Sequence, residues 1–240
     1  MKTTLIRASS RGHANYGWLN THHTFSFANY HNPNRIHFGA LRVLNDDVVG
    51  VGEGFDTHPH ENMEIISIPL YGELEHKDSM GHTQVIKTGE VQVMSAGTGI
   101  THSEYNASVN NLVNFFQIWI FPDEKNRTPR YEQRAFDFIH KKNQFVQIVG
   151  PKNDSSNTGL WIYQNAWLNI GAFEKGEEIN YQLKKKGNGV FAMVIEGEFT
   201  IGDQKLHFRD GLGIWDTENI QIMAKTENAR ILLIDVPMEF

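Results

Sequence analysis

Apolar and β-branched residues come in short runs along the chain, and turn residues separate the runs. In the first half the runs occupy residues 63–70, 83–86, 91–94 and 113–121. In the second half they occupy residues 145–149, 160–170, 179–183, 190–195, 199–201, 206–208, 213–215, 220–223 and 231–236. Short runs separated by glycine-containing turns are typical of β-sandwiches and β-barrels, so we predict an all-β protein.

A polar and charged stretch at residues 122–134, with Pro129 inside it, interrupts this pattern. Proline and clustered polar residues favour loops, so this stretch is the best candidate for a linker. The apolar spacing within residues 131–139 is compatible with one helical turn. We therefore predict two β domains, at residues 1–130 and 131–240.

Composition and charge restrict the functional classes. Acidic residues number 28 against 22 basic ones, and a net charge of −6 gives no electrostatic footprint for direct nucleic-acid binding. The chain has no cysteine, which excludes disulfides, thiolate catalysis, zinc fingers and iron–sulfur clusters. The first residues lack the apolar core of a signal peptide, and no apolar stretch has membrane-spanning length. We expect a cytoplasmic protein without a membrane partner.

Two closely spaced pairs of potential metal ligands stand out. One residue separates His58 from His60, and one residue separates His102 from Glu104. In an extended strand residues i and i+2 point to the same face, so each pair can aim two donors into one space. Imidazole and carboxylate donors suit iron, manganese, cobalt, nickel, copper or zinc better than calcium or magnesium. The alternative is that these histidines lie in loops or pack with their nitrogens satisfied, but two such pairs favour a metal site.

The distribution of histidine indicates which domain holds this site. Ten of the twelve histidines lie at or before His102, and only His207 falls within residues 161–240. We expect metal chemistry in the first domain alone. The second domain is then structural or helps to form a pocket.

The residues around the two pairs resemble the two sequence motifs of cupins, which are small β-barrels. Gly52 and Glu64 frame the first pair as in the first motif. Gly89, Gly99 and Asn106 frame the second pair as in the second motif.

Longer stretches resemble the pirin family, in particular its bacterial branch of bicupins. These stretches are residues 11–13, 17–19, 23–27, 38–43, 45–47, 58–64, 76–79 and 94–104, with residues 211–216 in the second half. The resemblance implies a bicupin of two cupin or jelly-roll-type β-barrels, with metal ligands only in the N-terminal barrel.

The pirin resemblance also implies the ligand set. It places one divalent transition metal on His58, His60, His102 and Glu104, with iron(II) leading by family analogy and manganese, cobalt, nickel, copper or zinc as the other ions that fit. Cupins in general use the carboxylate at the position of Glu64. Here we expect Glu64 to be a hydrogen-bond partner of the ligands or a fifth ligand.

Other residues receive weaker expectations. Gln117 either touches substrate or is a satisfied core residue. The remaining expectations are a pocket mouth at His23 and Phe27, apolar walls at Ile66, Ile68 and Trp119, and a surface hairpin carrying His76 and Asp78.

Pirins are described as quercetinase-like, and this gives our leading hypothesis. The protein would be a flavonol 2,4-dioxygenase, conventionally called quercetin 2,3-dioxygenase, that cleaves flavonols with dioxygen and releases carbon monoxide. Glu104 would be the catalytic base that takes the proton of the 3-hydroxyl group. A second hypothesis is a metal-dependent redox-sensing module that binds a protein partner, which the sequence does not identify. A third is an enzyme that acts on a different enolizable substrate.

Overall fold

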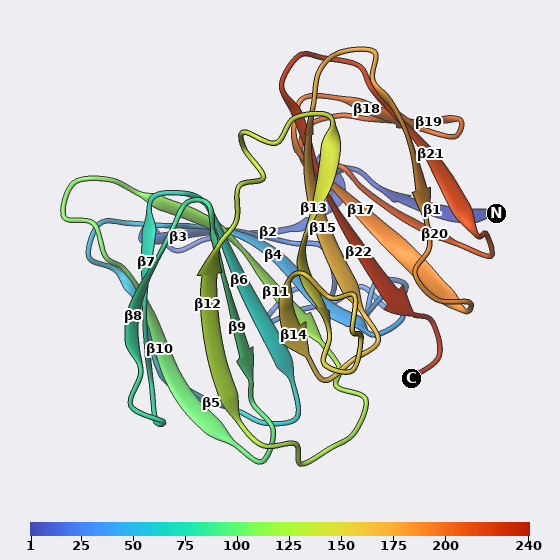
Figure 1. Ribbon diagram of the computed structural model, residues 1–240. Coiled ribbons are helices and arrows are strands. Elements are labelled where there is room, and N and C mark those ends of the chain that lie inside the picture. Colours follow the sequence, from blue (N-terminus) through green and yellow to red (C-terminus); the bar gives the residue numbers. More distant parts are fainter.

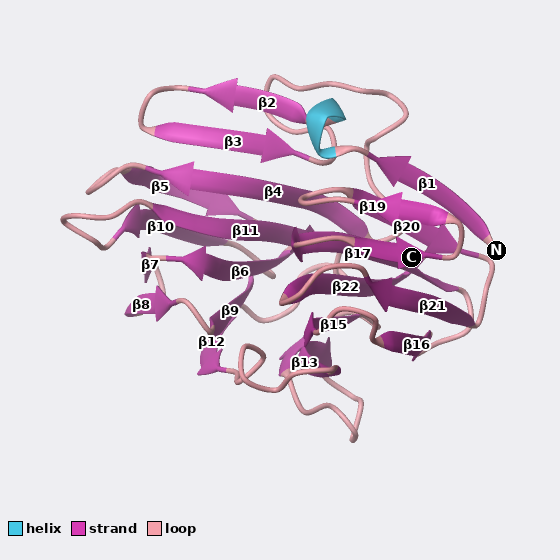
Figure 2. Ribbon diagram, turned by 90° about the horizontal axis from the view of Figure 1, so that it is seen from above, coloured by secondary structure: helices cyan, strands magenta, loops and turns pink.

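The computed structural model describes residues 1–240 and consists of strands, apart from one short 3₁₀ helix, η1 (Ala8–Ser10) (Figure 2). The strands are β1 (Lys2–Ile6), β2 (Gly12–Asn15), β3 (Leu19–His23), β4 (Leu41–Val49), β5 (Gly54–His60), β6 (Glu64–Tyr71), β7 (Glu73–Asp78), β8 (Thr83–Lys87), β9 (Glu90–Ser95), β10 (Ile100–Asn106), β11 (Val113–Ile120), β12 (Arg130–Ala135), β13 (Gln144–Pro151), β14 (Leu160–Ile162), β15 (Trp167–Phe173), β16 (Glu178–Gln182), β17 (Asn188–Glu196), β18 (Phe199–Ile201), β19 (Gln204–Leu206), β20 (Gly211–Trp215), β21 (Asn219–Ala224) and β22 (Ala229–Pro237). The prediction of an all-β protein is confirmed. No helix in the structure is long and apolar enough to span a membrane.

The strands form four sheets in two units that lie side by side (Figure 1). In the N-terminal unit a seven-stranded sheet, β12-β9-β6-β11-β4-β3-β2, faces a four-stranded sheet, β5-β10-β7-β8. In the C-terminal unit a seven-stranded sheet, β1-β20-β17-β22-β15-β13-β14, faces a four-stranded sheet, β16-β21-β18-β19. This is the arrangement of two β-barrels that the sequence predicts.

Two strands do not follow the predicted domain boundary at residue 130. Strand β1 leaves its own half of the chain and pairs with β20 of the C-terminal unit. Strand β12 begins at Arg130 and pairs with β9 of the N-terminal unit. The exact division into residues 1–130 and 131–240 stays a prediction.

Three local predictions are wrong. The predicted linker at residues 122–134 includes most of β12, and the helical turn within residues 131–139 is a strand instead, because β9 offers its free edge to this segment. The run at residues 160–170 is two strands, β14 and β15, which lie on either side of β13.

The largest apolar core joins the two units rather than filling either barrel. It contains 27 buried residues, including Ile66, Ile68 and Phe116 from the N-terminal unit and Phe191 and Leu232 from the C-terminal unit. A second core of 16 buried residues fills the C-terminal barrel. An interior filled by apolar side chains gives that barrel little space for metal ligands.

The interior of the N-terminal barrel is different, because a row of polar residues crosses its seven-stranded sheet. Gln92 lies opposite Ser67, Ser67 opposite Gln117, Gln117 opposite Asn45, and Asn45 opposite His23, on five successive strands. Directly opposed residues on neighbouring strands point to the same face of a sheet. The other face of β6 and β9 belongs to the inter-unit core, so the polar row faces into the barrel.

Candidate metal centre

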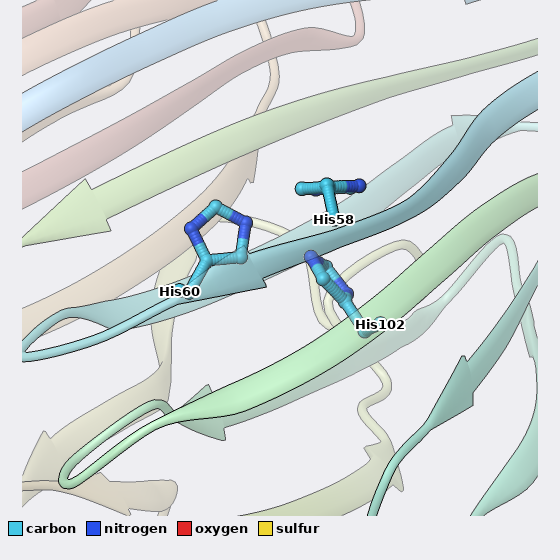
Figure 3. Close-up of side chains that lie close together, drawn as sticks. All are labelled: His58, His60 and His102. Atoms are coloured by element: carbon cyan, nitrogen blue, oxygen red, sulfur yellow. The ribbon is translucent and has the colours of Figure 1, made fainter.

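Three imidazole rings converge inside the N-terminal barrel from two paired strands, β5 and β10. His102 lies directly opposite His58 in the antiparallel ladder, and His60 follows His58 on the same face. The ring centroids are 4.5 Å apart for His58 and His102, 4.8 Å for His58 and His60, and 4.9 Å for His60 and His102. One nitrogen from each ring lies within 4.8 Å of the others. Figure 3 shows the three side chains reaching into one space.

The state of these rings fits metal binding. Nε2 of His102 is buried and has no hydrogen-bond partner, although a buried imidazole nitrogen normally finds one. Burial and the neighbouring imidazoles lower the pKa of His60 and of His102 to about 3, so both rings are neutral near pH 7. Because a metal binds the neutral ring through a lone pair, the cluster is ready to accept a cation. Nδ1 of His58 lies 2.7 Å from the carbonyl oxygen of Asp56, which leaves its Nε2 for a ligand role.

Glu104 lies beside this cluster but belongs to a second group. Its carboxylate, His102 and His76 also have ligand atoms within 4.8 Å of one another. A register irregularity between His102 and Glu104 in the pairing with β5 accompanies this offset from His58 and His60. That all four of His58, His60, His102 and Glu104 bind one ion therefore stays a prediction.

Two residues of the polar row hold the Glu104 carboxylate. The Ser67 hydroxyl donates to Oε1 at 3.0 Å, and the Gln117 amide donates to Oε2 at 2.6 Å. All three side chains are buried. Gln117 is thus a buried residue with a role at the site, because its amide N–H binds the candidate ligand Glu104. Charge-assisted hydrogen bonds of this kind fix the orientation of a carboxylate.

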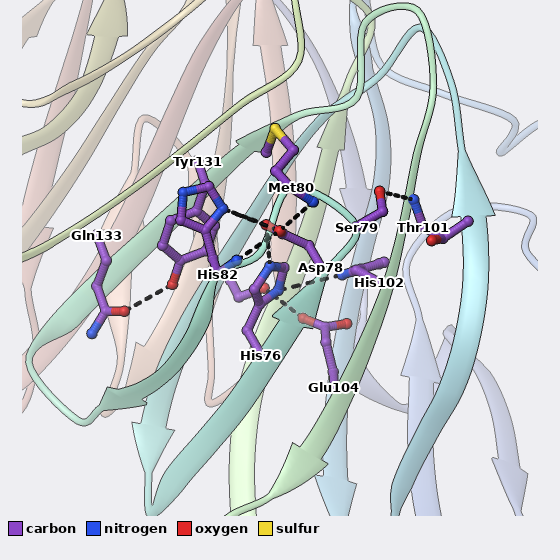
Figure 4. A network of polar contacts seen from close by, with 11 residues as sticks. His76, Asp78, Ser79, Met80, His82, Thr101, His102, Glu104, Tyr131 and Gln133 are labelled. Atoms are coloured by element: carbon purple, nitrogen blue, oxygen red, sulfur yellow. Dashed lines mark hydrogen bonds and ion pairs between the residues drawn. The ribbon is translucent and has the colours of Figure 1, made fainter.

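The prediction of a surface hairpin at His76 and Asp78 is wrong. Both side chains are fully buried, and His76 lies directly opposite Glu104 on β10 while Asp78 lies opposite His102 (Figure 4). The sequence contains the same i, i+2 spacing here as in the two recognised pairs. Spacing along the chain does not reveal the pairing of β7 with β10, and this pairing brings His76 and Asp78 next to the candidate ligands His102 and Glu104.

Glu64 lies on the other side of its sheet. It shares a face of β6 with Ile66 and Ile68, which belong to the core between the units, and its carboxylate accepts a hydrogen bond of 2.7 Å from the Ser95 hydroxyl. Burial raises the pKa of Glu64 to about 7, against the hydrogen bonds from Ser95 and from the backbone of Tyr163. Ile66 and Ile68 therefore do not line the barrel interior, contrary to prediction.

Aromatic side chains line the approach to the histidines. The ring of Trp119 meets that of His60 edge to face at 4.9 Å, and Phe27 meets Trp119 at 5.3 Å. His23 in turn packs on Phe27 at 5.3 Å. His60 also borders an open cavity of about 610 Å³, which is lined by the end of β5, the start of β10, the residues next to them, and Ser79. Of the three rings, that of His60 lines this cavity.

Comparison with protein families and curated proteins gives concordant matches. The family model Pirin matches residues 5–120, and the model Quercetinase C-terminal cupin domain matches residues 147–236. A protein of Escherichia coli K12 named quercetin 2,3-dioxygenase is 46% identical over 97% of this chain and 98% of its own length. A putative quercetin 2,3-dioxygenase of Pseudomonas aeruginosa is 38% identical over 94% of this chain and 95% of its own.

Solved structures agree with these matches. The bacterial pirin YhhW of Escherichia coli, in complex with nickel(II), is 44% identical, covers 98% of this chain and 99% of its own, and superposes with a TM-score of 0.92. A quercetin 2,3-dioxygenase of Acinetobacter baumannii, at 19% identity, covers 98% of this chain and 86% of its own with a TM-score of 0.77, which shows likeness of fold alone. The predicted bicupin fold is confirmed.

Proposed function

The chain belongs to the pirin family, and on that premise we propose that it is a quercetin 2,3-dioxygenase, which cleaves flavonols with dioxygen and releases carbon monoxide. The observation that carries this proposal is the near full-length similarity, at 46% identity, to the Escherichia coli protein of that name. The cluster of three imidazoles next to a carboxylate supports it, because such donors are typical of metal-dependent oxygenases.

The residues that would hold the metal are His58, His60, His102 and Glu104. The unpartnered Nε2 of His102 and the neutral state of His60 and His102 support this assignment. When bound, a divalent transition metal lowers the pKa of a coordinated hydroxyl group and supplies a site for dioxygen. We propose iron(II) as the ion by analogy with the family, and the nickel(II) in the Escherichia coli relative belongs to the same class of ions.

Glu104 is the proposed base for the flavonol 3-hydroxyl proton. A base must be held in place to take the proton, and the donors from Ser67 and Gln117 hold the two oxygens of the Glu104 carboxylate. The seven-stranded sheet thus orients a base that is carried by the four-stranded sheet.

The aromatic residues near His60 are the proposed substrate wall. A flavonol is a flat, largely aromatic molecule, and Trp119 with Phe27 offers flat apolar surface beside the ligands. The cavity of about 610 Å³ at His60 has the size of a small-molecule site. Substrate would enter there and meet the imidazoles from the side that the barrel leaves open.

The test is aerobic incubation of the metal-reconstituted protein with quercetin, with carbon monoxide measured. We expect stoichiometric carbon monoxide from the wild type, and a loss of at least about 100-fold in kcat for Glu104→Gln. Glu64→Gln is the matched control, because it changes an equally buried glutamate on the other face of the sheet. Wild-type protein that is fully loaded with metal and leaves quercetin intact would disprove the proposal.

The choice of ion has its own test. Metal-free protein is reconstituted with iron(II) or nickel(II) in parallel, and turnover is normalised to bound metal. Faster turnover with iron(II) is expected. Faster turnover with nickel(II) would make nickel the better-supported ion, and the proposal that quercetin is the substrate would stand.

A further inference from the structure

We propose that His76 is a positioning residue that fixes the tautomer of His102, so that Nε2 of His102 is the atom presented to the metal. The inference rests on the proposed function only in assuming that His102 serves a metal. His76 is fully buried, makes no part of the predicted ligand set, and contacts His102 directly.

The tautomers of His76 and His102 follow from their contacts, in which Asp78 binds His76 and His76 contacts His102. Nε2 of His76 lies 3.1 Å from Oδ2 of Asp78, and an ionised carboxylate can only accept, so Nε2 of His76 carries the hydrogen. In the ring form that carries a single hydrogen, on Nε2, the lone pair of His76 lies on Nδ1. That Nδ1 lies 3.4 Å from Nδ1 of His102, so in this tautomer His102 is the donor in the contact. Nε2 of His102 is left with a lone pair, and it is this atom that is buried without a partner.

The turn between β7 and β8 holds the carboxylate of Asp78 in place, so its position beside His76 is fixed. The backbone N–H groups of Met80 and His82 donate to its Oδ1 at 2.9 and 3.1 Å, and the ring of His82 lies 2.9 Å from its Oδ2. Burial by itself raises the pKa of Asp78, but the bonds from His76 and His82 outweigh it and lower the pKa. The carboxylate is therefore ionised and acts as an acceptor near neutral pH.

Tyr131 fixes the plane of the His76 ring. Its ring packs on His76 with centroids 4.7 Å apart and on His82 at 4.8 Å, so it lies between the two histidines (Figure 4). Tyr131 comes from β12, the strand that closes the edge of the facing sheet. The position of His102 Nε2 thus depends on residues of three strands and one turn.

The first test reads the tautomer directly. Protein with ¹⁵N-labelled histidine is studied by long-range ¹H–¹⁵N correlation, metal-free and with zinc(II) as a diamagnetic probe. We expect His102 to be protonated on Nδ1 in both states and to bind zinc through Nε2. Protonation of Nε2 in the metal-free protein, or zinc on Nδ1, would overturn the proposal.

The second test measures zinc affinity by chelator competition in three variants. His76→Phe keeps a ring but removes the acceptor, and we expect zinc to bind about 10- to 100-fold more weakly. His76→Asn should recover most of this loss, because its side-chain oxygen can stand where Nδ1 stood. His140→Asn is the matched control: it removes an exposed histidine that is likewise paired with an aspartate, Asp137, but takes no part in this network, and should change the affinity by less than about 3-fold.

Equal zinc affinity in wild type and His76→Phe would also overturn the proposal, and so would equal losses in His76→Phe and His76→Asn, because the hydrogen-bond acceptor would then have no effect. Quercetin turnover is a separate assay. If the wild type binds zinc through Nε2 of His102 but does not cleave quercetin, the proposed activity is wrong. The proposed role of His76 is then still supported.

Discussion

The hydroxyl of Ser67 on β6 donates a hydrogen bond of 3.0 Å to Oε1 of Glu104 on β10, and so connects the two facing sheets of the N-terminal barrel. Ser67 is fully buried and lies second in the polar row that crosses its sheet, between Gln92 and Gln117. A candidate ligand on one sheet is therefore oriented by the other sheet. The chemistry of the site depends on how the barrel closes as well as on the ligand-bearing strands.

Gln117→Leu is expected to damage both activity and stability. The change removes the amide that donates to Oε2 of Glu104 at 2.6 Å and leaves a buried carboxylate with one donor fewer. The free energy of unfolding should fall by about 1–3 kcal/mol, and kcat with quercetin by about 10-fold or more. Gln133→Leu is the control, because Gln133 is a glutamine of the same barrel whose amide donates to Val85 and Glu90 instead. Urea denaturation and steady-state kinetics check both; equal losses in the two variants would contradict the role of Gln117.

Glu64 makes the protein less stable at higher pH. Its pKa is about 7 in the folded chain against 4.5 for the unconstrained group, so between these values the unfolded chain ionises while the folded chain keeps the proton. Unfolding is then favoured as pH rises from about 4.5 to about 7, and the penalty is fully present above that range. Glu64→Gln removes it, so the unfolding free energy of the variant relative to wild type should be about 2–3 kcal/mol higher at pH 8 than at pH 4.

The measurement is urea denaturation of metal-free protein at the two pH values. Glu61→Gln, at an exposed glutamate, serves as the control and should show the same small difference at both. A pH-independent effect of Glu64→Gln would mean that the pKa of Glu64 is the same in the folded and the unfolded chain.

The sequence predicts the parts of the site that depend on local geometry. His58 with His60, and His102 with Glu104, lie on shared faces because alternation along one strand is a property of neighbouring residues. His76 and Asp78 have the same spacing, but their importance comes from the register of β7 against β10, which is fixed only by the closure of the barrel.

Two wrong expectations have the same physical origin. The sequence predicts Glu64 beside the ligands, yet residues 61–63 turn the chain from one sheet to the facing one, and the alternation of faces starts again at β6. Strand β12 was counted in a linker because its residues are polar and follow a proline, but an edge strand needs few apolar residues when its neighbour supplies the hydrogen bonds. Both cases are tertiary effects that a local pattern does not contain.

Trp119→Leu is expected to affect substrate binding more than chemistry. The indole lies edge to face with His60 at 4.9 Å and is backed by Phe27, so its loss removes flat apolar surface beside the ligands. KM for quercetin should rise about 10-fold, with kcat changed by less than about 3-fold. Trp161→Leu is the control. It removes an indole of the C-terminal unit that stacks on Arg130, and it should leave KM unchanged. If kcat falls and KM does not move, Trp119 acts on the reacting groups instead of forming a wall.

Asp46→Asn should be the most destabilising of these changes, because one carboxylate neutralises two buried guanidinium groups where the units meet. Oδ2 of Asp46 lies 3.3 Å from Arg11 and 3.4 Å from Arg209, a residue of the C-terminal unit. Removing the charge leaves two buried cations without the carboxylate that pairs with both, which costs about 3–5 kcal/mol in the free energy of unfolding. Asp216→Asn, which breaks an exposed pair with Lys2, should cost about 0–1 kcal/mol. Urea denaturation distinguishes the two; a loss below about 1 kcal/mol for Asp46→Asn would mean that water already solvates both arginines, and that the apolar core alone holds the units together.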